Sequence, residues 1–159
     1  MQGDYLPHCL VPLFWPDFGR QPTAPVAVEE RDCVVLTQSC DLENDKAALV
    51  ALCPVFSLPD FEAVNKQFAQ KGVWERVRQG RVEGLHLLAS PTEPTNNRAS
   101  FVADFRQIYS LPIGYLRGHA TALGPRWQLR SPFLEHLSQA FARFFMRVGL
   151  PSAIPAFKS

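Results

Sequence analysis

The amino-acid sequence predicts a small α+β domain built around an antiparallel, partly closed β-sheet. Two apolar runs, at 33–38 and 47–56, stand on either side of a short polar stretch and are typical of two paired strands. Apolar residues at helical spacing follow at about 60–80 and again at about 132–148. An order of strands, an inserted helical piece, further strands and a terminal helix indicates the α+β class.

The length and composition are those of one globular domain over residues 1–159. The chain has 159 residues, 47% of them hydrophobic and 19% charged, which is enough apolar material for a sizeable core. The first 19 residues contain no cationic leader and are interrupted by proline. No apolar run approaches the roughly 18 residues of a membrane span. We therefore expect a cytoplasmic protein without a membrane partner.

The four cysteines show none of the spacings that indicate a metal site. Cys9, Cys33, Cys40 and Cys53 form no CxxC pair, and the chain contains no glycine-rich phosphate loop. In a cytoplasmic chain such cysteines are expected to be reduced and mostly buried. The sequence therefore predicts no metal, no cofactor and no disulfide.

The first three strands are predicted from apolar runs that are bounded by proline or by polar residues. Residues 1–31 are rich in proline and aromatic residues, so we expect only a short strand at about 9–14, with loops after it. The strands at 33–38 and 47–56 are then predicted to pair as an antiparallel hairpin, with a polar turn over 39–46 at its tip.

A helical insertion over about 60–80 interrupts the strands. Its first helix is predicted to begin at Pro59 and to end before Gly72, and a second short helix to cover 73–79. The apolar residues expected to face the core are Phe61, Val64, Phe68, Trp74 and Val77.

Two more strands and the clearest helix complete the prediction. The strands are expected at 84–90 and 100–111, the second with a bulge. For the helix at 132–148, Ser131 suits an N-cap and Pro132 the first helical position. Its apolar stripe is Leu134, Leu137, Phe141, Phe144 or Phe145, and Val148. Its opposite face carries His136, Gln139, Arg143 and Arg147.

Short strings in the first paired strands resemble the MazF/PemK family of bacterial toxins. In that family an arginine shortly precedes a buried strand, and here Arg31 precedes "VVLT" at 34–37, with "CPVFS" following at 53–57. The resemblance implies an SH3-like β-barrel, with strands within about 9–56 and 84–130 and a closing helix. It also implies a module of a bacterial toxin or defence system that binds RNA or cleaves it as a metal-independent endoribonuclease.

The resemblance assigns catalytic roles to three residues. Arg31 would stabilise the charge that develops on the phosphate, with Thr37 and Ser57 near the phosphate and Thr37, Ser57 or a histidine serving for proton transfer. The sequence departs from the family at two of its positions, because Phe56 stands where the family has its catalytic threonine and Asp32 where it has proline. The alternative for Arg31 is an ordinary ion pair with a neighbouring carboxylate.

The string "TQSCDL" at 37–42 places a thiol and a carboxylate side by side at the predicted hairpin tip. Cys40 would act as an enzyme nucleophile if a histidine assisted it, and His119, in a predicted turn over 117–124, is the candidate. A close carboxylate at Asp41 would raise the pKa of the thiol and oppose that role. The alternatives are a buried cysteine beside an Asx turn, and a non-catalytic tip that binds a neighbour-encoded protein.

Charge is unevenly distributed along the chain. Residues 1–93 contain eight basic and thirteen acidic side chains, whereas 94–159 contain eight and two. A basic half with interleaved aromatic residues is typical of a nucleic-acid surface, and the residues predicted to bind RNA are Arg106, Arg117, Arg126, Trp127 and Arg130. The alternative is that the basic half docks on the acidic half. The polar face of the terminal helix is either solvated or meets a second copy of the chain.

Overall fold

The computed structural model describes residues 1–16, 18–20, 26–44 and 46–146 and has the predicted α+β class. Its strands are β1 (Tyr5–Leu13), β2 (Ala27–Val35), β3 (Leu49–Ser57), β4 (Leu85–Leu88), β5 (Phe101–Asp104) and β6 (Tyr109–Pro112). Its α-helices are α1 (Ser39–Glu43), α2 (Leu58–Val64), α3 (Val73–Arg78), α4 (Ile113–Leu123) and α5 (Phe133–Phe145). Two short 3₁₀ helices are η1 (Lys66–Ala69) and η2 (Asn97–Ala99). Within the described residues, none of the helices has the length and apolar character needed to span a bilayer.

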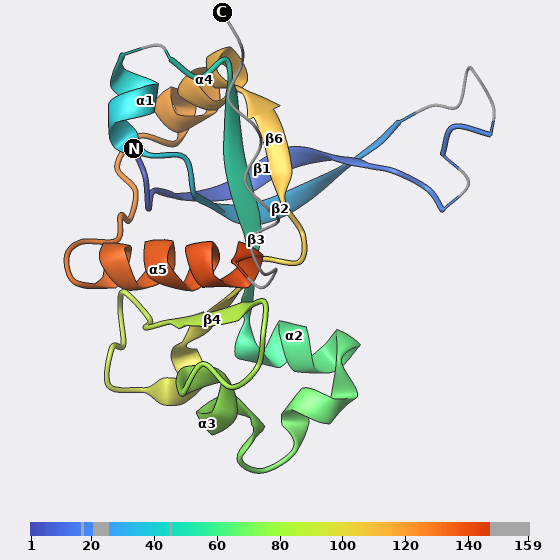
Figure 1. The fold of residues 1–159 in the computed structure, drawn as a ribbon, viewed down its shortest axis with the longest axis vertical. Helices are drawn as coiled ribbons and strands as arrows, with labels where there is room; N and C mark the ends of the chain where they lie inside the picture. The colour runs from blue at the N-terminus through green and yellow to red at the C-terminus, as the bar shows by residue number, and fades with distance from the viewer. Residues whose placement is uncertain (17, 21–25, 45, 147–159) are drawn as a thin grey trace, which may run out of the picture.

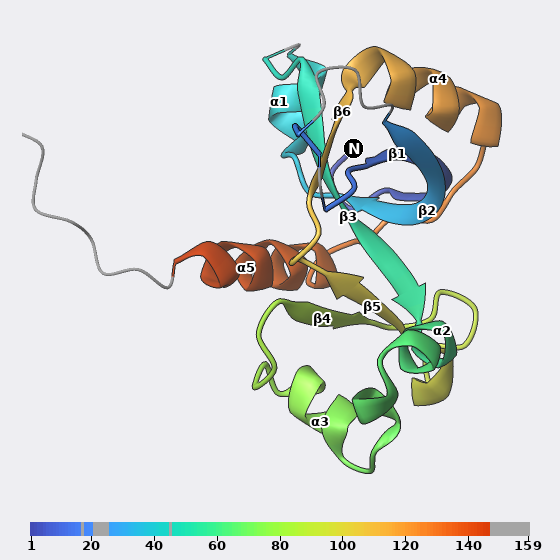
Figure 2. The ribbon, with the colours of Figure 1, turned by 90° about the vertical axis from the view of Figure 1, so that its right-hand side faces the viewer.

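The six strands form one antiparallel sheet whose organising element is β3. The order is β1-β2-β3-β5-β4, and β6 also pairs with β3. The first residues of β3 pair with β6, its middle pairs with β2, and its last residues pair with β5. The molecule therefore has an upper part around α1 and α4 and a lower part around α2 and α3, with α5 lying between them (Figures 1 and 2).

The predicted hairpin is confirmed, and its apolar strand is buried on both faces. Cys33 to Val35 of β2 lie opposite Leu52 to Pro54 of β3. Cys33 and Val35 face the core beneath α4, whereas Val34 faces the core beneath α5. A strand that packs on both sides needs apolar residues at successive positions, which explains the continuous run in the sequence. A third core lies between α2, α3 and the lower strands.

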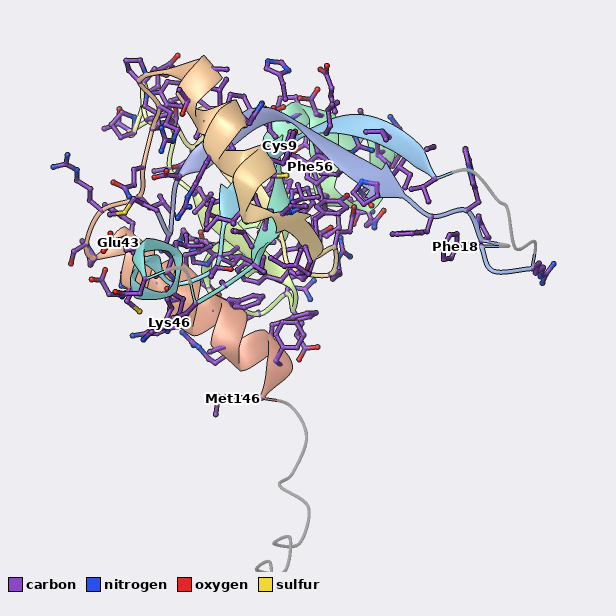
Figure 3. The ribbon with its side chains drawn as sticks, turned by 90° about the horizontal axis from the view of Figure 1, so that it is seen from above. Cys9, Phe18, Glu43, Lys46, Phe56 and Met146 are labelled. Carbon is purple, nitrogen blue, oxygen red and sulfur yellow. The ribbon has the colours of Figure 1, made fainter. Side chains whose placement is uncertain are left out.

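The first two strands are longer than predicted and form a projecting arm. β1 begins at Tyr5, four residues earlier than expected, and β2 begins at Ala27 in a stretch predicted as loop. The two prolines within β1 are tolerated because β1 is an edge strand, where half of the backbone groups have no strand partner. Figure 3, viewed from above, shows the arm leaving the body toward Phe18, with α4 lying across Cys9.

Helix α4 is the main element that the sequence reading missed. Residues 117–124 were expected as a turn within the strand region 84–130, but Ile113–Leu123 is helical. Gly114 and Gly118 favour a break locally. The apolar side chains at helical spacing nevertheless pack on the upper core, and Leu116 is buried there. Tertiary packing therefore outweighs the local preference.

The segment at 100–111 is two strands and not one. β5 ends at Asp104 and β6 begins at Tyr109, and the chain turns between them. The buried Asp104 carboxylate accepts hydrogen bonds from the backbone N–H of Arg106 (3.0 Å) and from its guanidinium (2.8 and 2.7 Å), which stabilises this turn.

Three smaller expectations also differ. The tip at 39–46 contains the short helix α1 in place of a simple turn. Val64, expected in the core, is 84% exposed, because α2 ends there and the buried Phe68 belongs to η1. Ser131 does not cap α5, whose N-cap is Pro132. The predicted α5 itself is confirmed, with Leu137 fully buried; Arg147 and Val148 lie outside the described residues.

Candidate functional site

The three residues assigned to cleavage by the toxin resemblance make structural contacts at separate places. Arg31 of β2 forms an ion pair with Glu29 at 2.6 Å, and its Nε is buried without a hydrogen-bond partner in the described part of the chain. Thr37 Oγ1 accepts a hydrogen bond from the backbone N–H of Ala51 at 2.8 Å and closes the β2–β3 hairpin. This interaction joins two strand ends.

Ser57 lies at the other end of β3 and caps helix α2. Its hydroxyl accepts a hydrogen bond from the Asp60 backbone N–H at 3.2 Å and donates one to the Asp60 carboxylate at 2.5 Å. Ser57 lies six positions along the strand from Ala51, which Thr37 contacts, a span of about 20 Å. The structure therefore does not bring the hydroxyls of Thr37 and Ser57 to one phosphate.

Cys40 and Asp41 lie on α1, and Cys40 is exposed. The Cys40 thiol contacts Gln38 Oε1 at 3.6 Å and Asp41 Oδ1 at 3.8 Å. His119 belongs to α4, where its Nε2 lies 2.7 Å from the Pro7 carbonyl oxygen and its ring stacks on Tyr115. The contacts of the thiol are therefore acceptor oxygens and not a histidine. No group of three or more His, Cys, Asp or Glu in the described ranges is arranged to hold a metal ion.

Three of the predicted RNA-binding arginines are engaged within the protein. Arg106 pairs with buried Asp104 at 2.7 Å, and Arg126 pairs with buried Asp4 at 2.6 Å. Arg117 Nη2 donates a hydrogen bond to the Leu42 carbonyl oxygen at 3.0 Å and so links α4 to α1. These guanidinium groups connect distant parts of the chain.

The other two predicted residues, Trp127 and Arg130, line a cleft of about 780 Å³ between the two halves of the molecule. The cleft lies between α3, the lower strands and the segment that leads into α5. Its aromatic lining is Tyr5, Trp74, Phe101, Trp127 and Phe133, and its basic lining is Arg78, His86, Arg130 and His136. Glu75 is the carboxylate in the lining, and Arg78 binds it at 2.8 and 2.6 Å. The cleft thus combines aromatic surface with little uncompensated negative charge.

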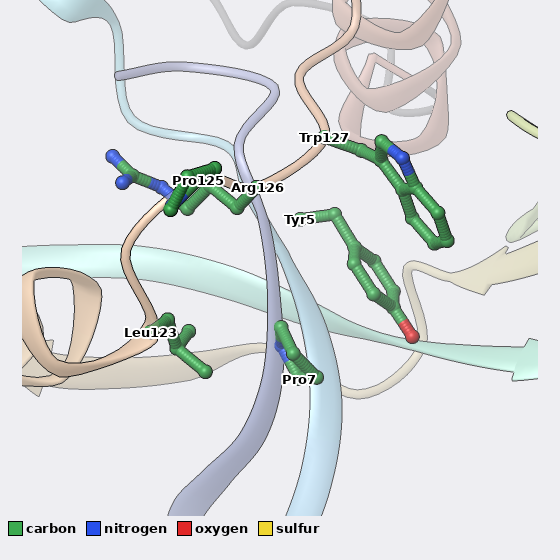
Figure 4. A pocket seen from close by; sticks show the side chains of 6 residues that line it. All are labelled: Tyr5, Pro7, Leu123, Pro125, Arg126 and Trp127. Atoms are coloured by element: carbon green, nitrogen blue, oxygen red, sulfur yellow. The ribbon is translucent and has the colours of Figure 1, made fainter.

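Trp127 is 49% exposed, and its main chain is anchored to β1. Its carbonyl oxygen accepts the Tyr5 backbone N–H at 2.9 Å, and its ring lies 5.8 Å from the Tyr5 ring. The neighbouring Arg126–Asp4 pair fastens the same segment. A second hollow of about 470 Å³ shares Tyr5 and Trp127, and Figure 4 shows how both rings stand at its side. Trp127 therefore presents its aromatic ring to two adjoining hollows.

Tyr5 supports this arrangement through its hydroxyl. The hydroxyl donates a 2.5 Å hydrogen bond to the Asp32 carboxylate, which also accepts the His8 backbone N–H at 3.0 Å. Burial, followed by this hydrogen bond to Asp32, raises the pKa of Tyr5. The hydroxyl therefore stays protonated and keeps the ring in place.

His86 and His136 are cleft residues that sequence reasoning did not select as a site. His86, on β4, is half-buried and stacks on Phe105 with ring centres 6.2 Å apart. Burial, followed by the positive charges of His136 and Arg143 on α5, lowers the pKa of His86 to about 4. The two histidines are fifty positions apart, so no local motif joins them.

Comparison of the chain with protein families, with curated proteins and with solved structures finds no match.

Proposed function

We propose that this chain binds single-stranded RNA in the aromatic cleft that contains Trp127 and Arg130. The observation that carries the proposal is the exposed yet tethered indole of Trp127, which stands between two hollows. Proteins that bind single strands stack bases on aromatic side chains and place arginines near the backbone phosphates. Both kinds of group line this cleft.

The size and charge of the cleft fit this ligand. A volume of about 780 Å³ lies within the range of pockets that hold a nucleotide-sized molecule. Arg130 is exposed beside Trp127 and supplies a cation for a phosphate. Phe101 and Phe133 provide further apolar surface for a second base. An RNA in this cleft would thus meet several aromatic groups and the Arg130 cation.

The relation to MazF/PemK toxins, with an SH3-like barrel and a role in a bacterial conflict system, is part of the same proposal. It is supported by the strings around Arg31 and by the curved sheet in which β1 approaches β6. Because Arg31, Thr37 and Ser57 have structural partners, the proposal rests on the binding cleft and not on these three residues.

Fluorescence anisotropy with a labelled single-stranded RNA of mixed sequence tests the proposal. Trp127→Ala is expected to weaken binding about 5- to 150-fold, because stacking of one base contributes about 1–3 kcal/mol. Arg130→Ala is expected to weaken binding less and to reduce the salt dependence by about one phosphate contact.

Trp15→Ala is the matched control, because Trp15 is also exposed but lies on the arm. It is expected to leave RNA affinity unchanged. Equal affinities of the wild type and Trp127→Ala, or binding that does not respond to salt, would refute the proposal.

A further inference from the structure

On the projecting arm, β2 has a neighbouring strand on one side only (Figure 3). It pairs with β1 from Ala27 onward, but its pairing with β3 begins only at Cys33. Beyond that point β3 continues along β5 instead. Among the described residues, the first part of β2 is therefore an open sheet edge.

The hydrogen bonds of the arm show which residues face this open edge. The backbone N–H of Leu10 donates to the Tyr115 hydroxyl on α4 at 2.7 Å, so it points away from β2. Leu10 lies opposite Glu30, and residues opposite each other in an antiparallel pair both point their backbone groups inward or both outward. The N–H and C=O groups of Glu30 therefore point outward, and so do those of Val28, two residues away. In the described part of the chain, neither N–H has an acceptor outside the β1–β2 pair.

The outer edge of β1 is protected by comparison. Its Leu10 N–H is bound by Tyr115, and Pro12, which points the same way, has no N–H to offer. Proline and covering side chains are the usual means by which proteins block a sheet edge. Residues 27–32 of β2 contain no proline. The edge of β2 is therefore the side of the arm that is able to accept another strand.

The side chains along this edge are apolar and acidic. Val28 is 61% exposed and lies opposite Pro12, on the same face as Leu10, which is 48% exposed. The exposed Glu30 follows on that face, and its ion-pair partner is the exposed His8 of β1 at 3.4 Å. Residues 27–32 together contain three carboxylates and one arginine. A strand that fits this edge therefore carries positive charge beside an apolar residue.

We propose that the open edge of β2 binds an extended segment of a partner protein as an added β-strand, with a basic residue opposite Glu30 and an apolar residue opposite Val28. The two partner residues are two positions apart, because both point to the same face of the sheet. The outward backbone groups provide the main-chain hydrogen bonds of such a complex, and the paired side chains provide its selectivity. This site lies on the arm and does not depend on the RNA cleft.

A second copy of the chain fits this edge less well. Antiparallel pairing centred on Glu30 or on Glu29 places two glutamates opposite each other, and like charges at such positions are destabilising. A register centred on Val28 leaves Glu30 opposite Val26, without a countercharge. A lysine or arginine of a different protein supplies that countercharge.

The test is an NMR titration of the isotope-labelled full chain with the blocked peptide Thr-Lys-Thr-Val-Thr-Lys-Thr-Val-Thr, in which lysine and valine share one face. The amide signals of Val28 and Glu30 are expected to shift and their hydrogens to exchange more slowly. The same peptide with glutamate in place of lysine is expected to bind about fivefold more weakly. A peptide N-methylated at its lysines and valines is expected to bind at least about tenfold more weakly, because it has lost the donors that face β2.

Variants of the chain test the side-chain pair and the edge separately. Glu30→Lys is expected to reverse the preference, so that the glutamate peptide binds about fivefold more tightly than the lysine peptide. Glu43→Lys makes the same charge change at an exposed residue of α1 and is the matched control. Val28→Pro removes an outward N–H and is expected to weaken peptide binding while RNA affinity is unchanged. Should circular dichroism show that Val28→Pro is unfolded, the N-methylated peptide tests the same hydrogen bonds on the wild type.

Several results would overturn this inference. They are no binding at about 1 mM lysine peptide, equal affinities of the wild type for the lysine and glutamate peptides, and an unchanged preference in Glu30→Lys. A dimer in sedimentation that Val28→Pro dissociates would assign the edge to a second copy. Slower amide exchange of Val28 and Glu30 on addition of single-stranded RNA would assign it to RNA. Loss of the RNA proposal itself, by equal RNA affinities of the wild type and Trp127→Ala, leaves the peptide result unaffected.

Discussion

Arg126 donates hydrogen bonds through both Nε (2.9 Å) and Nη2 (2.6 Å) to a single carboxylate oxygen of Asp4. Asp4 is only 4% exposed, and 122 positions separate the two residues. The pair holds the segment that carries Trp127 against the start of β1, where Asp4 also forms a bridge with Gln128. The position of the exposed indole therefore depends on a buried charge pair.

We expect Arg126→Ala to destabilise the fold by about 2 kcal/mol, because it leaves a buried carboxylate with weaker compensation. The loss is at the low end of the range for buried pairs, since the amino group of Met1 also contacts Asp4 at 3.1 Å. Urea unfolding measures it as a shift of the midpoint at constant slope. Arg78→Ala, which removes an exposed ion pair with Glu75, is the control and should not shift the midpoint. Equal effects of the two substitutions would contradict the buried-charge argument.

Thr37 is expected to act on stability and not on RNA chemistry. Thr37→Val keeps the shape but removes the acceptor for the Ala51 N–H, so unfolding should become easier by about 1 kcal/mol. Thr37→Ser retains the hydroxyl and should behave nearly as the wild type. Unfolding in urea and the RNA assays are measured on the same proteins. A loss of RNA cleavage in Thr37→Val without any change in stability would favour the toxin-like role instead.

His86 should make stability depend on pH. Its pKa is about 4 in the folded protein and 6.5 for an ordinary histidine, so the unfolded chain binds more protons between these values. Stability is therefore complete above about pH 6.5 and is lost as the pH falls toward 4. The pKa of His86 is lowered first by burial of the ring and then by the charges of His136 and Arg143.

We expect His86 to lower the free energy of unfolding by about 2 kcal/mol when the pH falls from about 7 to about 5. Urea unfolding at the two pH values measures it. The dependence should flatten in His86→Gln and persist in His8→Gln. An unchanged pH dependence in His86→Gln would show that the ring is not buried as described.

Cys40 should be the cysteine that reacts in the folded protein. Cys9, Cys33 and Cys53 are buried, whereas Cys40 is exposed on α1. A thiol reagent such as Ellman's reagent should therefore label one thiol per chain without denaturant and the remaining three only on unfolding. Cys40→Ser should abolish the native labelling. Labelling of a second thiol in the folded state would mean that the strand core opens readily.

Local sequence patterns predicted the elements whose cause is local. The continuous apolar run before Thr37 indicated a buried strand, and the polar stretch after it indicated that the chain reverses. The stripe through Leu137 indicated the last helix, because residues three and four apart share one face. α4 was missed because its glycines weaken the local signal, while its core partners lie far away in sequence.

The candidate site was only partly predictable for the same reason. Trp127 and Arg130 were selected from the mixture of aromatic and basic residues, and they line the cleft. The contacts that engage Arg126 and Arg106 with buried carboxylates could not be read from composition. No sequence pattern indicated that His86 and His136 line the same cleft, because neither position is unusual by itself.

The sequence by itself determined the α+β class, the β2–β3 hairpin and the amphipathic α5, since each follows from the spacing of residues a few positions apart. Only the tertiary structure decided which polar side chains form hydrogen bonds and ion pairs within the protein and which are exposed to solvent or to the cleft. That distinction depends on long-range packing, which joins Asp4 to Arg126 and brings β4 beside α5. Burial and charge neutralisation are properties of such contacts, and the chain order does not contain them.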